Sequence, residues 1–201
     1  AERQDFCFTG EFTERGIKGR HGYMTEEVVD EGRFMVRVPR ELRDVAVLVE
    51  PLTIAEKALL QVWQVQQRLP WACDIEDGKT GGHCHTAVIL GAGPVGLLGA
   101  MAFVAGGFRT VVYSREEARS PKADLVRSIG AEYVSAATHD VESMARTVGP
   151  IDVVYEATGA SKLSFDVLSR LGPNALFVFT GVPGRKAPIE VDTDLIMRNL
   201  V

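Results

Sequence analysis

The sequence predicts an α/β protein whose main part is a doubly wound parallel sheet. Three observations lead to this fold class. Strand-like and helix-like segments alternate from Thr86 onward, a glycine-rich turn at residues 91–96 follows the first of these strands, and the strand-like segments are short, rich in valine and flanked by glycine. Such strands are typical of parallel sheets that helices cover on both faces. A segment of different character precedes this region.

The first part of the chain, from Ala1 to about Pro39, has no helical periodicity. It is rich in glycine, and apolar residues alternate with polar ones in Tyr23–Val29 and Phe34–Val38. Alternation with a period of two is typical of half-buried strands. The sequence therefore predicts a loop followed by two short strands.

A long helix is predicted to begin at Thr53 and to join two domains. Thr53-Ile54-Ala55-Glu56 fits a capping box, in which the threonine hydroxyl and the glutamate carboxylate accept hydrogen bonds from otherwise unpaired amides. Pro70 ends the helical pattern. The apolar positions that recur every three or four residues are Ile54, Ala58, Val62, Val65 and Leu69.

The alternating region predicts five strands separated by helices. A sixth strand would complete the two mononucleotide-binding halves of a Rossmann-type sheet, so we expect the domain to be truncated before its last strand. The predicted elements are strand Thr86–Leu90, helix Pro94–Ala105, strand Thr110–Tyr113, helix Lys122–Ile129, strand Glu132–Ser135, helix Val141–Thr147, strand Asp152–Glu156, helix Lys162–Leu171, strand Ala175–Phe179 and a helix starting near Asp192.

The motif Gly91-Ala92-Gly93-Pro94-Val95-Gly96 predicts a dinucleotide site, because it follows a strand directly and opens a helix. Gly91 permits the tight turn, Gly93 lets the backbone approach a pyrophosphate, and Gly96 allows close packing of helix on strand. Pro94 suits the first helical turn. The amides and the dipole at the helix start attract phosphate. The alternative is a glycine-rich turn that binds nothing.

The end of the second strand of this region favours NADP over NAD. NAD sites usually have an acidic residue there, whereas this chain has Ser114 and Arg115, which suit a 2′-phosphate. Glu116 and Glu117 follow and either repel that phosphate or lie in solvent, while Arg119 and Lys122 can restore positive potential. The alternative for Arg115 is an ordinary surface arginine.

Two further turns end strands at the same edge of the sheet. Ala157-Thr158-Gly159 follows the fourth strand, and Thr180–Gly184 follows the fifth. Ligands of open α/β sheets bind at the carboxyl ends of the strands, so both turns are candidates to line the cofactor. Short turns also need glycine for purely structural reasons, and this alternative stays open.

Four stretches of the sequence share one further feature, which is their spacing along the chain: Cys7, Thr9-Gly10-Glu11-Phe12-Thr13-Glu14, Glu50-Pro51-Leu52 and the motif at residues 91–96. With them the chain resembles the zinc-dependent medium-chain dehydrogenase/reductase family, in particular its archaeal-type glucose dehydrogenases. The resemblance implies that residues 1–52 are a β-rich remnant of a GroES-like catalytic domain. It implies that residues 53–201 are the NAD(P)-binding Rossmann domain.

The resemblance also implies roles for individual residues. Cys7 matches the last of four structural zinc ligands, and Glu50 matches a carboxylate at or near the catalytic zinc; the partners of both are absent from this chain. Glu14 matches a residue that contacts sugar hydroxyls. Ser114 and Arg115 match an Asn-Arg pair that favours the 2′-phosphate, although Glu116 departs from a frequent second arginine and makes dual use of NADP and NAD plausible. The residues matching loops around the nicotinamide are Ala157, Thr158, Gly181 and Val182.

The function implied is oxidation of glucose or another aldose at C1, with hydride transfer to NADP and a lactone as product. Zinc in the intact protein would act as a Lewis acid. We expect this chain alone to bind the dinucleotide without turning over sugar. The alternatives are an isolated cofactor-binding module without catalysis and a medium-chain alcohol or polyol dehydrogenase.

Charge and cysteine content bear on partners and location. With 22 basic and 27 acidic residues the net charge is -5, without a basic run, so we expect no nucleic-acid or membrane partner. The chain has three cysteines at unrelated spacings, Cys7, Cys73 and Cys84. This argues against a disulfide framework and for a reducing compartment, so we expect the protein in the cytoplasm. His83-Cys84-His85 matches no closed zinc site and is interpreted as a loop. The resemblance suggests that the intact protein is a homo-oligomer.

Overall fold

The computed structural model describes residues 7–69, 81–182, 184 and 188–199. The chain forms two compact units, Ala1–Ala46 and Val47–Val201, which are described separately. The domain identities assigned above to residues 1–52 and 53–201 stay predictions. Cys73 lies outside the described residues.

The first unit contains little regular structure. Among its described residues the elements are β1 (Glu14–Arg15), β2 (Gly19–Arg20), the 3-10 helix η2 (Gly32–Phe34) and the 3-10 helix η3 (Arg40–Leu48), which continues into the second unit. The two strands predicted from alternation in Tyr23–Val29 and Phe34–Val38 are wrong. No neighbouring strand pairs with them among the described residues, and the side chains of Val29 and Val36 are exposed. Tyr23 instead donates a hydrogen bond of 3.0 Å to the carboxylate of Asp30.

Helix α1 (Val49–Gln66) begins earlier than the capping box predicts. Leu48 is its N-cap, without a side-chain hydrogen bond, and the Thr53 hydroxyl instead donates within the helix to the carbonyl of Glu50, at 2.6 Å. Ser and Thr side chains often bond to a preceding carbonyl in this way. The predicted stripe is correct at Ala58 and Val62, whereas Ile54 is exposed. The buried positions of the helix are Ala55, Ala58, Leu59, Val62 and Gln66.

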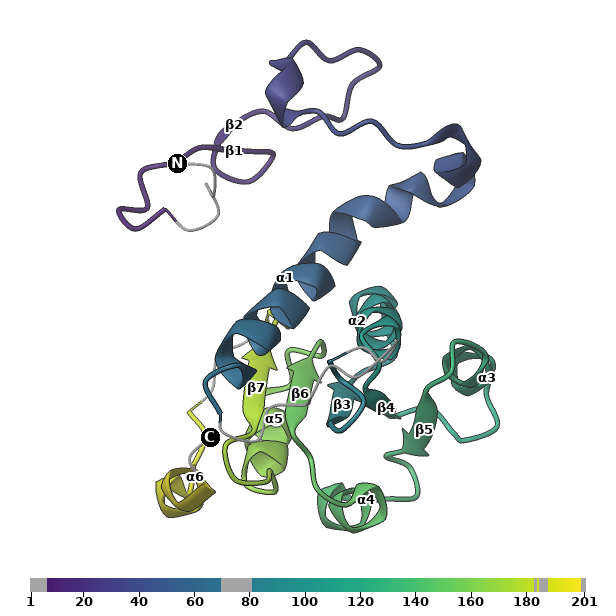
Figure 1. The fold of residues 1–201 in the computed structure, drawn as a ribbon, viewed down its shortest axis with the longest axis vertical. Helices are drawn as coiled ribbons and strands as arrows, with labels where there is room; N and C mark the ends of the chain where they lie inside the picture. The colour runs from purple at the N-terminus through teal and green to yellow at the C-terminus, as the bar shows by residue number, and fades with distance from the viewer. Residues whose placement is uncertain (1–6, 70–80, 183, 185–187, 200–201) are drawn as a thin grey trace. The chain divides into compact units, whose positions relative to one another are not determined.

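The second unit confirms the alternation of strands and helices (Figure 1). The bounds of its first and third strands and of the helix Pro94–Ala105 are those predicted, and most of the other ends differ by a few residues, which is ordinary for element boundaries. After α1 the elements are β3 (Thr86–Leu90), α2 (Pro94–Ala105), β4 (Arg109–Ser114), α3 (Pro121–Ser128), β5 (Glu132–Ser135), α4 (Val141–Val148), β6 (Val153–Glu156), α5 (Ser161–Leu168), β7 (Leu176–Phe179) and α6 (Thr193–Asn199).

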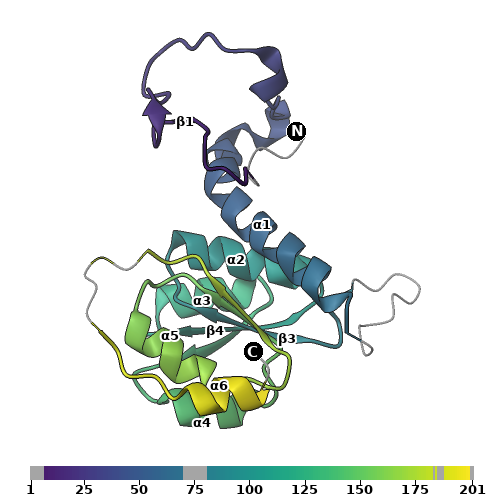
Figure 2. The same cartoon turned by 90° about the vertical axis from the view of Figure 1, so that its left-hand side faces the viewer.

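The five strands form one parallel sheet in the order β5-β4-β3-β6-β7. The chain runs outward from β3 to β5 and then returns to the other side of β3 with β6. Helices consequently cover both faces, with α2 on one side and α4 on the other (Figure 2). This confirms the doubly wound sheet, and it places the reversal of strand order between β3 and β6, where such sheets form a ligand crevice.

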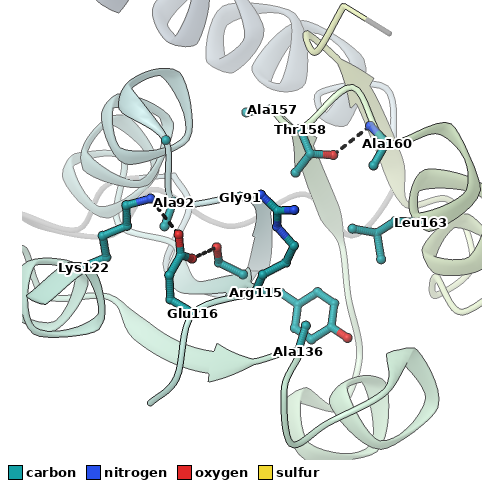
Figure 3. A pocket seen from close by; sticks show the side chains of 13 residues that line it. Gly91, Ala92, Arg115, Glu116, Lys122, Ala136, Ala157, Thr158, Ala160 and Leu163 are labelled. Atoms are coloured by element: carbon teal, nitrogen blue, oxygen red, sulfur yellow. Dashed lines mark hydrogen bonds and ion pairs between the residues drawn. The ribbon is translucent and has the colours of Figure 1, made fainter. Parts of the chain in front are cut away.

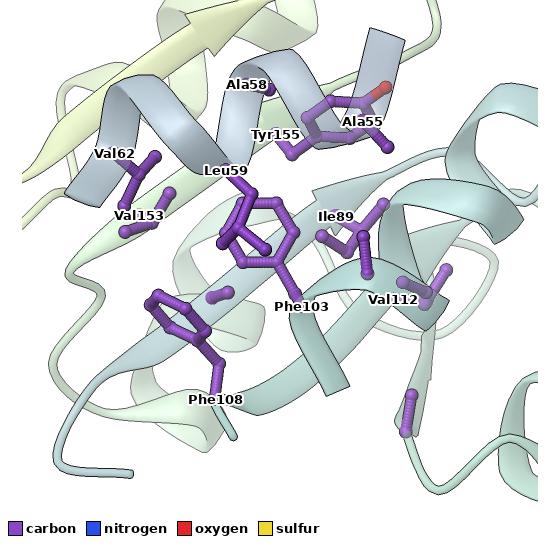
Figure 4. Close-up of a cluster of buried hydrophobic side chains, with 14 of the residues drawn as sticks. Ala55, Ala58, Leu59, Val62, Ile89, Phe103, Phe108, Val112, Val153 and Tyr155 are labelled. Atoms are coloured by element: carbon purple, nitrogen blue, oxygen red, sulfur yellow. The ribbon is translucent and has the colours of Figure 1, made fainter. Parts of the chain in front are cut away.

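Two apolar cores, one on each face, hold the sheet between its helices. On one face Phe103 of α2 is fully buried against Phe108, with ring centroids 5.0 Å apart, and near Tyr155 of β6 at 6.0 Å (Figure 4). Ala55 and Val62 of α1 cover the same core. On the other face the core includes Met144, Val148, Val167 and Leu168. Burial of each large apolar side chain contributes about 1.5–3 kcal/mol.

The strand register aligns the carboxyl ends at one edge. Leu90, the last residue of β3, lies opposite Tyr113 on one side and Glu156 on the other, and Glu156 lies opposite Phe179. Each strand therefore delivers the residues that follow it to a common edge of the sheet.

Two observations concern location and cysteines. None of the helices within the described ranges combines the length and the apolar character that a bilayer crossing requires. Cys84 is disulfide-bonded, whereas Cys7 is a free thiol. The sequence argument against disulfides is therefore wrong at Cys84.

Candidate functional site

A pocket of about 350 Å³ lies at the carboxyl edge of the sheet (Figure 3). Its walls come from the segments that follow β3, β4, β5 and β6. Most of the predicted cofactor residues line it together: Gly91, Ala92, Gly93, Ser114, Arg115, Ala157 and Thr158. The pocket therefore joins three of the sequence motifs that are far apart in the chain.

The glycine turn forms the floor of this pocket. Gly91 has φ +100°, which side chains rarely allow, and its amide donates to the carbonyl of Tyr113 at 2.9 Å. A Cβ on Gly96 would overlap the carbonyl oxygen of Gly91, so the turn closes only with glycine at that position. Gly93 has nothing within 4 Å of the place where a Cβ would lie. The backbone at Gly93 is thus open to a ligand.

The start of α2 supplies amide donors beside that opening. Gly93 is the N-cap in an extended conformation and offers no side-chain acceptor, and Pro94 occupies the first turn, where its missing N–H is harmless. The amides of a helix start and the helix dipole bind phosphate. The turn and the open space over Gly93 therefore fit the pyrophosphate of a dinucleotide.

The end of β4 holds a network of charged and hydroxyl groups. The Glu116 carboxylate accepts hydrogen bonds from Ser114 Oγ and from Lys122 Nζ, each at 2.6 Å. The bond from Lys122, followed by that from Ser114, lowers the pKa of Glu116 to about 2. Two further hydroxyls, of Tyr133 and Ser135, donate to the Glu116 backbone carbonyl at 2.8 and 2.7 Å. Glu116 is therefore an ionised, well-anchored part of the pocket wall rather than a side chain in solvent.

Arg115 is the cation in this pocket that is not engaged in a network. Its side chain is exposed, and among the described residues it forms no ion pair or hydrogen bond. Figure 3 shows it extending across the pocket toward Gly91 and Thr158. A guanidinium in this place can make bidentate bonds to a phosphate.

Glu156 is a residue whose importance the sequence reasoning missed. It ends β6 and is 1% exposed, and its Oε1 accepts from the amides of Thr158 and Gly159 at 2.6 and 2.8 Å. The Thr158 hydroxyl donates to the same oxygen at 2.5 Å, and the Gly181 amide donates to Oε2 at 3.2 Å. An acid as the last residue of an otherwise apolar, buried strand was the signal in the sequence.

The remaining predicted cofactor residues lie outside the pocket lining. Pro94, Val95 and Gly96 belong to the first turn of α2. Gly181 and Val182 are not among the described residues that line it, and Val182 is 88% exposed. Gly181 nevertheless contacts the site, because a Cβ there would collide with the amide of Gly159.

The residues predicted near zinc or sugar do not join this pocket. Cys7 and Glu14 belong to the first unit and Glu50 to the first turn of α1; Glu14 and Glu50 are exposed. A hydrogen bond with Thr9 lowers the pKa of Cys7. Within the described ranges, no three side chains of His, Cys, Asp and Glu converge as a metal site requires. The described residues therefore do not fit zinc by themselves.

Comparisons with known proteins relate this chain to glucose dehydrogenases. Residues 43–201 match the family described as glucose dehydrogenase C-terminus. The chain is 38% identical over 203 residues to the glucose 1-dehydrogenase of Metallosphaera sedula, covering 99% of this chain and 53% of that protein. It is 34% identical over 197 residues to the glucose 1-dehydrogenase of Methanocella arvoryzae, covering 98% and 52%.

A solved structure is similar as well. The glucose dehydrogenase of Haloferax mediterranei, in complex with NADP, Zn and gluconolactone, is 32% identical with a TM-score of 0.80, over 98% of this chain and 53% of that one. The chain thus spans about half the length of the relatives it matches. These matches confirm the resemblance that the sequence motifs indicated.

Proposed function

This chain belongs to the glucose dehydrogenase C-terminus family, and we propose that it is the cofactor-binding part of an NADP-dependent glucose (aldose) 1-dehydrogenase. One observation carries the proposal. The glycine turn, which ends at the N-cap Gly93 of α2, and Arg115, which forms no ion pair or hydrogen bond among the described residues, line a single pocket at the carboxyl edge of the sheet. The Haloferax mediterranei enzyme, whose complex holds NADP and gluconolactone, supports the cofactor and the class of product.

Each part of the pocket has a proposed task. The turn at Gly91 and Gly93 and the first amides of α2 receive the pyrophosphate. Arg115 binds the 2′-phosphate by charge-assisted hydrogen bonds, with Ser114 beside it. Ala157 and Thr158, together with Gly181 and Val182, bracket the nicotinamide. Bound NADP accepts a hydride, which would come from C1 of the sugar and leave a lactone.

The residues outside the pocket keep their proposed roles in the intact protein. Glu14 is proposed to accept hydrogen bonds from sugar hydroxyls, as a carboxylate can. Glu50 and Cys7 are proposed as ligands of a catalytic and a structural zinc, respectively.

The proposal is tested by the Arg115→Ala variant of the complete chain, titrated with NADPH and with NADH. Loss of a charge-assisted contact to the 2′-phosphate should raise the Kd for NADPH at least about tenfold, with a much smaller change for NADH. Arg119→Ala is the matched control, since Arg119 is also exposed but is not among the described residues that line the pocket. Equal losses for the two cofactors would refute the assignment of Arg115.

A further inference from the structure

The hydrogen bonds of Glu156 join two loops that are separate in the sequence. Three donors to Oε1 come from the β6–α5 loop, at Thr158 and Gly159, and one donor to Oε2 comes from Gly181, after β7. The backbone carbonyl of Glu156 also accepts from Gly181, at 3.0 Å. Glu156 thus holds both loops at the edge of the sheet, the β6–α5 loop through its carboxylate and Gly181 through its carboxylate and its backbone carbonyl.

A buried carboxylate at this place needs an explanation beyond packing. Burial of a charge is costly unless hydrogen bonds compensate it, and the three strand residues before Glu156, two valines and a tyrosine, are fully buried. An apolar residue would fill the same space at lower cost. It would, however, leave the loop amides that Glu156 now pairs without this acceptor.

The loops that Glu156 joins approach the phosphate-binding turn very closely. A Cβ on Gly91 would lie 2.8 Å from the Thr158 methyl carbon, and a Cβ on Gly181 would collide with the Gly159 amide. The loop after β6 is therefore in contact with the turn after β3 on one side and with the segment after β7 on the other. A shift of one loop must displace the next, because no space separates them.

We infer that Glu156 is a positioning residue, which sets the spacing between the β6–α5 loop and Gly181 and thereby shapes the nicotinamide half of the cofactor site. The inference rests on the proposed function. It separates two parts of the pocket: Arg115 and Ser114, at the end of β4, bind the adenosine half without any hydrogen bond to Glu156. Glu156 should therefore affect the nicotinamide half far more than the adenosine half.

The Glu156→Gln variant tests this separation. A glutamine keeps the size of the side chain, and its carbonyl oxygen can still accept from Thr158 and Gly159. Its amide nitrogen then faces the Gly181 amide, so that two donors oppose each other and the side-chain part of the link between the loops is lost, while the hydrogen bond from Gly181 to the backbone carbonyl at position 156 remains. Asp152→Asn is the matched control, because Asp152 accepts from the Thr86 amide, at 2.7 Å, next to the opposite end of β6.

Affinities are measured in the complete chain for NADP and for 2′,5′-ADP, which lacks the nicotinamide half. We expect Glu156→Gln to weaken NADP binding about tenfold and to leave 2′,5′-ADP binding within about twofold of the parent, since one charge-assisted hydrogen bond is lost. The control should change neither affinity. Equal weakening of both ligands, or no weakening of NADP, would overturn the inference while the NADP site itself stands. Failure of the unmodified chain to bind 2′,5′-ADP would instead refute the proposed function.

A measurement on the unmodified chain covers the case in which Glu156→Gln does not fold. Amide hydrogen exchange of Thr158, Gly159 and Gly181 should slow when NADP is added and stay unchanged with 2′,5′-ADP. Equal protection by the two ligands, or none by either while both bind, would overturn the role assigned to Glu156.

Discussion

Replacing Glu116 by glutamine should tighten the binding of NADP and leave NAD binding nearly unchanged. The Glu116 carboxylate lines the pocket beside Ser114 and Arg115, the proposed 2′-phosphate contacts. Its pKa is lowered to about 2, so it is ionised at neutral pH and repels a phosphate. Glutamine removes that charge. It also weakens the hold on the Ser114 hydroxyl and the Lys122 ammonium, which now donate to the two carboxylate oxygens and would have a single neutral acceptor left.

The size of the effect follows from the charges. Two unit charges about 6 Å apart repel by roughly 0.7–2.8 kcal/mol at an effective dielectric constant between about 80 and 20. Lys122 cancels part of the field of Glu116, and salt screens the rest, which favours the lower end. A gain of roughly 1–1.4 kcal/mol corresponds to a five- to tenfold lower Kd.

The assay is a fluorescence titration of the complete chain with NADPH and NADH. Glu117→Gln is the matched control, because Glu117 is the next residue, is exposed and is not among the described residues that line the pocket. We expect a five- to tenfold lower Kd for NADPH in Glu116→Gln only, and a change for NADH within about twofold. The same gain for both cofactors, or the same gain in the control, would refute the argument from repulsion.

Three further predictions concern the turn, a helix cap and acid stability. Gly93→Ala should keep the melting temperature and weaken NADPH binding, since a Cβ there meets only the space open to the ligand. Gly96→Ala should lower the free energy of unfolding by about 1–3 kcal/mol, because a Cβ there overlaps the carbonyl of Gly91. Thermal melts in which Gly93→Ala is the less stable variant would contradict this. Ser120→Ala should lower the free energy of unfolding, measured in urea, by about 1 kcal/mol, because the Ser120 hydroxyl caps α3. A change near zero would show that this cap does not stabilise the protein. The folded-state pKa of Glu116 is depressed, so its hydrogen bonds stabilise the protein above a pH of about 4.5, and this contribution is lost as the pH falls toward about 2. Glu116→Gln should therefore flatten the dependence of the free energy of unfolding on pH in this range. An unchanged dependence would exclude the contribution.

Local patterns in the sequence predicted the sheet well, because they coincide with what the fold requires. The strand Thr86–Leu90 is apolar from Ala87 on, and in a sheet covered on both faces every one of these apolar positions is buried. The same kind of local pattern failed where no partner surface exists among the described residues. The alternation in Tyr23–Val29 has no strand beside it, and the capping box at Thr53 lies inside a helix that begins at Val49.

The site was predicted less completely than the fold, because its decisive contacts join distant residues. The motif at residues 91–96 and Arg115 are local signals, and both lie where they were expected. That Tyr133 and Ser135 would hold the backbone of Glu116, and Gly181 the carboxylate of Glu156, depends on the register of neighbouring strands and on how loops meet. Spacing along one chain does not contain that information.

The most direct test of the account is a competition experiment on the complete chain. NADPH bound to the pocket should be displaced by 2′,5′-ADP at much lower concentration than by 5′-AMP, because only the former carries the phosphate that Arg115 is proposed to bind. Displacement by both nucleotides at equal concentration would contradict the preference for NADP. Absence of saturable NADPH binding would contradict the cofactor site itself.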